Sequence, residues 1–138
     1  MSWLGKLLRL FPNRDPYPEA PVPPPEGVAR LHLFSGRFGS DLDAYAYVFE
    51  APDPDHPEPF TNDLPEAFID TTRVQIAHGA RLEDAIARIA GGRALDLRHL
   101  IDADDTLIIV DEAAFGGFPF ALGDTPRARY LGAWDVRT

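Results

Sequence analysis

Acidic side chains are concentrated in a proline-rich stretch near the middle of the chain. Six acids fall within eighteen residues: Asp53, Asp55, Glu58, Asp63, Glu66 and Asp70. Prolines between them stiffen the backbone, so this segment loses less conformational entropy on binding than a flexible loop would. Carboxylates at such spacing do not form a recognisable catalytic pair, but they can meet a cationic surface. We also expect Phe60 to be exposed among them, because an apolar anchor beside charge is typical of a protein-binding surface.

The sequence therefore predicts a partner-binding surface made of Asp53, Asp55, Glu58, Phe60, Asp63 and Asp70. The alternative is a solvated loop without a partner, because loops are generally polar and lie at the surface.

Other patterns that would carry catalysis, metals or cofactors do not occur in the sequence. The chain has no cysteine, which excludes disulfides, thiolate metal sites and a cysteine nucleophile. The four histidines are scattered; of these, His32 and His78 approach each other only if their predicted strands pair. The run from Asp102 to Asp105 lacks the glycine and the glutamate of a calcium loop. Because GxSxG, phosphate-loop and GxGxxG spacings are also missing, we predict a non-enzymatic protein with no metal and no cofactor.

The distribution of charge limits the class of partner. The whole chain carries a formal net charge of −9, yet residues 1–14 hold Lys6, Arg9 and Arg14 and no acid, a charge of +3. The remaining residues therefore carry −12. A field of that sign repels nucleic acid and steers cationic proteins toward the surface, although solubility alone would also account for it.

Hydrophobic periodicity predicts a single α+β domain over residues 28–138, with a mixed sheet of about four strands and two to three packed helices. The expected strands are Val28–Phe34, Arg73–His78, Thr106–Val110 and Arg129–Val136. The uninterrupted apolar run of Thr106–Val110 is typical of a central strand that is buried on both faces. Arg81–Ala90 and Leu95–Ile101 are expected to be helical.

A further helix is expected to begin after Ser40, which stands three residues before Asp43 in a capping pattern. Its apolar residues recur with helical spacing, and we expect them to face the core. These residues are Leu42, Tyr45, Ala46 and Phe49.

The N-terminal part of the chain differs from the domain in composition. Residues 1–11 place apolar side chains on one helical face and Lys6 and Arg9 on the other, which predicts a short amphipathic helix. Residues 12–27 contain seven prolines and predict an extended linker. The helix could dock on its own domain, on a partner, or on an anionic membrane surface as a peripheral contact. No apolar run reaches the roughly 20 residues that span a bilayer, and no signal-peptide cleavage site follows the first eleven residues, so we expect a cytoplasmic protein.

Several short motifs resemble the immunity protein family twenty-two of bacterial polymorphic toxin systems. They are the run from Leu33 to Ser40 followed by Leu42 and Tyr45, the run from Pro59 to Leu64, and Tyr130-Leu131-Gly132. The likeness covers about residues 30–134. This family often has Trp where Phe34 stands, and the N-terminal helix and linker lie outside its pattern. The resemblance implies a cytoplasmic antitoxin that binds and blocks a cognate toxin, with a nuclease as one candidate.

These observations favour a non-catalytic binding protein that occludes a cognate toxin, or another cationic protein, through its acidic surface. An acidic inhibitor suits a nuclease, because a nuclease needs a basic cleft for the phosphates of its substrate. An adaptor domain that its N-terminal helix tethers to a membrane or a larger assembly is the main alternative. A small hydrolase with a site assembled from dispersed residues is a third.

Overall fold

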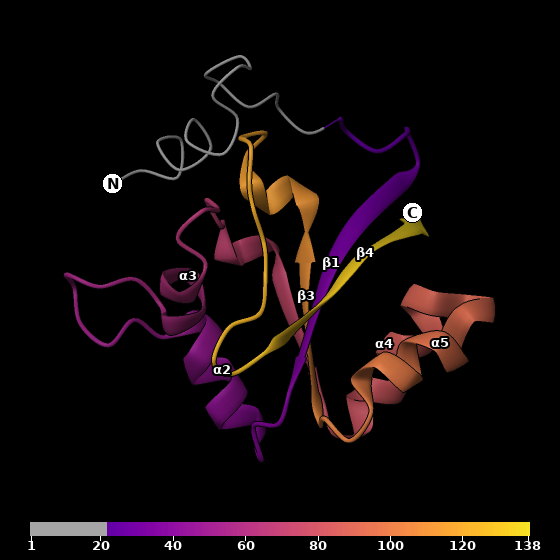
Figure 1. The fold of residues 1–138 in the computed structure, drawn as a ribbon, viewed down its shortest axis with the longest axis horizontal. Coiled ribbons are helices and arrows are strands. Elements are labelled where there is room, and N and C mark those ends of the chain that lie inside the picture. Colours follow the sequence, from indigo (N-terminus) through magenta and orange to yellow (C-terminus); the bar gives the residue numbers. More distant parts are fainter. Residues whose placement is uncertain (1–21) are drawn as a thin grey trace.

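The computed structural model describes residues 22–138 (Figure 1). The predicted amphipathic helix over residues 1–11 and the linker up to residue 21 lie outside the described residues. The last part of the linker contacts the domain: the guanidinium of Arg30 donates to the carbonyl oxygen of Val22, and the amide of Thr138 donates to the carbonyl oxygen of Gly27.

The elements follow one another as β1 (Val28–Gly36), α2 (Asp41–Phe49), α3 (Pro59–Asp63), η1 (Thr71–Arg73), β2 (Val74–His78), α4 (Ala80–Ala90), η2 (Gly91–Arg93), α5 (Ala94–Ile101), β3 (Thr106–Asp111), η3 (Glu112–Phe115) and β4 (Arg129–Arg137). This single α+β domain, with its four strands and its helices, confirms the predicted class.

The four strands form one sheet in the order β2-β3-β1-β4, and every neighbouring pair is antiparallel. The expectation of a mixed sheet is therefore wrong. β1 and β2 run in the same direction but do not pair, because β3 lies between them and runs against both. For the same reason His32 and His78 stay apart, with His32 opposite Val110 and His78 opposite Thr106.

Helices cover both faces of the sheet and create two apolar cores. Figure 1 shows α2 and α3 on one side and α4 and α5 on the other. On β3, Ile108 and Val110 point toward α2 and α3, whereas Leu107 and Ile109 point toward α4 and α5. All four side chains are at most 3% exposed. The prediction of a central strand buried on both faces is confirmed, and the period-2 alternation of a strand explains how one strand supplies both cores.

Helix α2 begins as predicted but buries a different face. The Ser40 side chain accepts a hydrogen bond from the Asp43 amide at 3.1 Å, which caps the helix. The buried residues of α2 are Ala44, Tyr47 and Val48, whereas Leu42 is 78% exposed and Tyr45 is 53% exposed. The expected core face is therefore wrong: at 3.6 residues per turn it lies on nearly the opposite side of α2 from the buried face, and the two faces share no residue. α2 carries two separate apolar arcs, and the arc that includes Tyr47 packs against the sheet.

Candidate functional site

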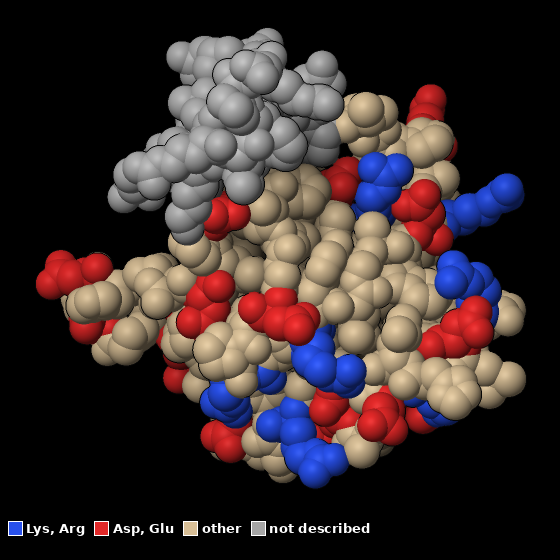
Figure 2. All heavy atoms as spheres, in the orientation of Figure 1, with Lys and Arg blue, Asp and Glu red and all other residues tan. Residues whose placement is uncertain are grey.

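Acidic residues dominate the part of the molecule formed by α2, α3 and the segments around them. Between Arg37 and Arg73 the chain contains nine acids and no lysine or arginine. We call residues 38–72 the acidic segment. Its loop from Ala51 to Glu58 projects from the body of the domain (Figure 1), and Figure 2 shows acidic atoms at the tip of this projection.

An open hollow of about 820 Å³ lies beside α2 and α3. Its lining consists of Asp43, Ala46, Tyr47, Glu50, Ala51, Pro52, Pro59, Asp63, Pro126 and Arg127. Three carboxylates and one guanidinium thus face the hollow, which we call the acidic hollow. Ala51, Pro52 and Pro59, at the base of the projecting loop, also line this hollow. Because proline fixes the backbone angle φ, the two prolines restrict the motion of the backbone near the carboxylates.

A hydrogen bond from Tyr47 holds the Asp63 carboxylate in the lining of the acidic hollow. Its hydroxyl donates to a carboxylate oxygen of Asp63 at 2.6 Å and lies 2.8 Å from Oγ1 of Thr125. Burial, followed by the hydrogen bond to Asp63, raises the pKa of Tyr47 above its usual value. The phenol therefore keeps its proton and remains a donor to Asp63.

Arg127, the one basic residue in the lining of the acidic hollow, stacks its guanidinium on the Phe38 ring at 4.6 Å from the ring centroid.

Two of the predicted acids serve local turns. Asp53 accepts from the Asp55 amide at 2.8 Å and from the ring of His56, and these contacts lower the pKa of Asp53, with the His56 bond as the largest cause. Asp70 caps η1 by accepting from the amide and the hydroxyl of Thr72, which lower its pKa. Asp70 does not line the acidic hollow, so the structure does not bring it together with Asp63.

Phe60 does not provide the exposed anchor that the sequence led us to expect. It is 0% exposed and packs edge to face against Phe34, with 5.1 Å between the ring centroids, and against Tyr47. The one-turn helix α3, with Pro59 at its start, turns this ring inward. The expectation of an exposed Phe60 is wrong, and its ring instead fixes the base of the projecting loop to the sheet.

Asp43 and Glu50 are the acids of the hollow that the sequence reading missed. Glu50 is the C-cap residue of α2 and follows Asp43 by seven residues, a spacing that places two residues on one side of a helix. That spacing is the signal that would have found them. Within the described chain, no donor is paired with the carboxylates of Asp43, Glu50, Asp55 and Glu58.

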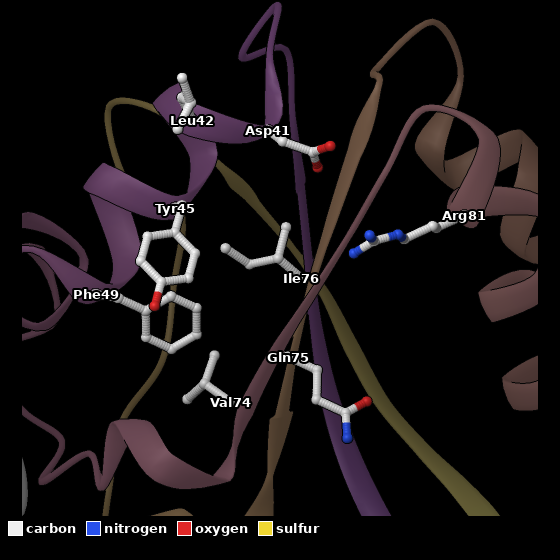
Figure 3. Close-up of a pocket in the computed structure, with 8 residues that line it drawn as sticks. All are labelled: Asp41, Leu42, Tyr45, Phe49, Val74, Gln75, Ile76 and Arg81. Atoms are coloured by element: carbon white, nitrogen blue, oxygen red, sulfur yellow. The ribbon is translucent and has the colours of Figure 1, made fainter.

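A second concavity, of about 500 Å³, separates α2 from the edge strand β2. Figure 3 shows its lining residues, which are Asp41, Leu42, Tyr45, Phe49, Val74, Gln75, Ile76 and Arg81. The rings of Tyr45 and Phe49 lie 4.8 Å apart at their centroids. We call this feature the β2 groove. Its exposed apolar wall is the α2 face that the sequence had assigned to the core.

A buried polar network crosses the α2 side of the sheet. Nε2 of His32 lies 2.9 Å from Glu112, and its Nδ1 lies 2.8 Å from the hydroxyl of Tyr130. Arg30 pairs with the same Glu112 at 3.4 Å. A neutral His32 that donates from Nε2 and accepts at Nδ1 satisfies all of these groups.

His32 makes folding sensitive to mild acid. Its burial outweighs the opposing pull of the Glu112 hydrogen bond and lowers the pKa of His32 below 6.5. The unfolded chain therefore binds this proton first, so the stabilisation from neutral His32 is complete above about pH 6.5 and is lost as the pH falls below it. One such group changes the free energy of unfolding by at most about 1.4 kcal/mol per pH unit.

The measurement is urea unfolding at pH 7.0 and at about pH 5.5 for the wild type and for His32→Gln, with His99→Gln, at an exposed position, as the matched control. We expect a smaller loss of stability with acid in His32→Gln than in the other two proteins. An equal loss in all three would contradict this assignment.

In the part of the chain that the structure describes, no group of three histidine or acidic side chains converges in a way that would hold a metal ion. Likewise, none of the helices within residues 22–138 is long and apolar enough to cross a membrane. Comparison with known proteins adds no relative: the chain matches no family model, no curated protein and no solved structure.

Proposed function

We propose that this protein is a non-catalytic binding protein that engages a cationic protein partner through its acidic segment, as a toxin-neutralising immunity protein occludes its cognate toxin. The observation that carries the proposal is the run of nine acids without lysine or arginine over residues 38–72. This run includes the three carboxylates of the acidic hollow. Such a one-signed surface raises the rate of encounter with a cationic partner and disfavours nucleic acid.

The shape of this side of the molecule also supports a binding role. The projecting loop has its base fixed by the buried Phe60, and Asp53 organises the loop through His56 and the Asp55 amide. A surface held in this way loses little entropy when a partner binds. The motif resemblance to immunity protein family twenty-two agrees with this role, and a toxin with a basic cleft is the partner that it suggests.

The proposal is tested with the product of the gene adjacent to that of this protein, by co-purification and then by stopped-flow association. We expect Asp53→Lys/Asp55→Lys/Glu58→Lys to slow association at least about tenfold at low salt, because steering depends on local charge. At about 0.5 M salt the difference should shrink, because the screening length falls to a few ångströms. The melting temperature should barely change, since exposed charges contribute little to stability.

The matched control is Glu83→Lys/Asp84→Lys/Asp96→Lys, which makes the same change in net charge on the exposed surface of α4 and α5. It should slow association much less. Equal slowing by both triple variants would show that only net charge matters, and no slowing by the first would remove the projecting loop from the interface. If the adjacent gene product does not bind at all, the toxin-neutralising role is contradicted.

A further inference from the structure

Strand β2 has one open edge. It is the terminal strand of the sheet and pairs only with β3 among the described residues. Alternate backbone amides and carbonyls of β2 therefore point away from the sheet. A free edge of this kind is a template for an added strand, in which main-chain hydrogen bonds supply affinity and side chains supply specificity.

The α2 side of this edge is apolar and partly exposed: Val74 is buried, whereas Ile76 and Phe49 are half-buried. Val74 and Ile76 point toward α2, as Ile108 and Val110 do on the neighbouring strand. Figure 3 shows Tyr45, Phe49, Val74 and Ile76 gathered on one side of β2. Tyr45, at 53% exposure, and Leu42, at 78%, extend this apolar wall into solvent. An added strand would place every second side chain against it.

The opposite side of the same edge carries arginines. Gln75 points toward α4, where it accepts a hydrogen bond from the guanidinium of Arg88 at 3.4 Å. Arg81, at the start of α4, lines the β2 groove together with Gln75 and with the acidic Asp41. Arg73 and Arg88 line a neighbouring hollow that also includes Gln75. Three arginines thus lie around β2; Arg73 is paired with Asp70 at 3.7 Å, whereas no acid among the described residues is paired with Arg81 or Arg88.

We propose that β2 accepts an extended segment of a partner protein as a fifth strand, and that this segment alternates apolar and acidic side chains. The apolar residues pack against Tyr45 and Phe49 in the β2 groove, and the acidic residues pair with Arg81 and Arg88 on the α4 side. The apolar wall of this site lies on α2, within the acidic segment, but the charged groups that it uses are arginines of α4, outside that segment. The two proposals can therefore fail independently.

The probe is a fluorescein-labelled heptapeptide of alternating glutamate and valine, titrated with the full-length protein and followed by fluorescence anisotropy. Its control is the same peptide with lysine in place of glutamate. The net charge of −9 favours the lysine peptide, whereas the arginines beside β2 favour the glutamate peptide. We expect the glutamate peptide to bind at least several-fold more tightly at about 0.15 M salt, where the long-range field is largely screened. Equal or tighter binding of the lysine peptide, or no binding of the glutamate peptide, would overturn the proposal.

Backbone methylation tests the strand geometry. Because only one edge of an added strand faces β2, methylating the amides of the glutamates and methylating those of the valines should have unequal effects. We expect one of the two methylated peptides to bind at least about tenfold more weakly, through the loss of two or more hydrogen bonds, and the other to bind nearly as before. If neither methylated peptide is weakened, the site is not a strand edge.

Substitutions in the protein locate the site. Arg81→Glu/Arg88→Glu should reverse the preference between the two peptides. Tyr45→Ser should weaken both, while Leu95→Ser, at a residue 75% exposed on α5, should change neither. Each variant is first shown to be folded by its circular dichroism. An unchanged preference in the double arginine variant would contradict the site.

Discussion

Replacing Ile108 with alanine is expected to lower the free energy of unfolding by about 2–5 kcal/mol. Ile108 lies in the middle of β3, a central strand of the sheet, and its side chain is 0% exposed. It belongs to the core under α2 and α3, together with Phe34, Phe60 and Val110. The substitution removes three carbon atoms from a close-packed site, so the lost transfer free energy adds to the cost of the cavity.

Urea denaturation measures this change, and Leu42→Ala serves as its control because Leu42 is 78% exposed on the same side of the sheet. The control should change stability by no more than about 0.5 kcal/mol. A loss below about 0.5 kcal/mol for Ile108→Ala would mean that β3 is not the centre of the core.

Replacing Gly36 with alanine should destabilise the fold by at least about 2 kcal/mol, because it inserts a methyl group where there is no space. A Cβ at this position would collide with the carbonyl oxygen of Arg127 and lie 2.8 Å from the ring of Phe38. The carbonyl belongs to the backbone just before β4, so it cannot move without disturbing the strand.

Gly92→Ala is the matched control, since a Cβ there meets no atom within 4 Å and the backbone requires no positive φ. Thermal unfolding should show a clear fall in melting temperature for Gly36→Ala and little change for Gly92→Ala. Similar melting temperatures for both variants would contradict the close approach of β1 and the segment before β4.

Local patterns predicted most of the elements of the fold. The strand expected over Val28–Phe34, the apolar run of β3 and the Ser40 cap each depend on neighbours in sequence, and the structure confirms all three. The pairing of the strands depends on which segments meet across the whole chain. No local pattern in β1 or β2 indicates that β3 will lie between them and run against both.

Exposure was harder to predict, because it depends on contacts between distant residues. Phe60 is buried by Phe34, which is far from it in the sequence. On α2, the sequence offers two apolar arcs. The arc that is buried contains Tyr47, whose hydroxyl donates to Asp63 and whose ring packs on Phe38. The arc that was expected in the core became the wall of the β2 groove.

The candidate acidic site was predicted in part. The sequence identified Asp55, Glu58 and Asp63, whereas Asp43 and Glu50 join Asp63 only through the packing of α2 beside α3. In the sequence, Asp53 and Asp70 could not be distinguished from Asp55, Glu58 and Asp63, because all five are acids in the same stretch of the chain. Their hydrogen bonds to nearby amides give them local roles, which depend on turn geometry rather than on composition.

The most direct test of the acidic surface is amide hydrogen exchange of the protein alone and in complex with the co-purified product of the adjacent gene. The proposal predicts slower exchange in α2, in the projecting loop and in α3, from Asp41 to Asp63, with little change in α4 and α5. Slower exchange confined to α4, α5 or β4, with residues 41–63 unchanged, would contradict the claim that the acidic segment is the surface that meets the partner.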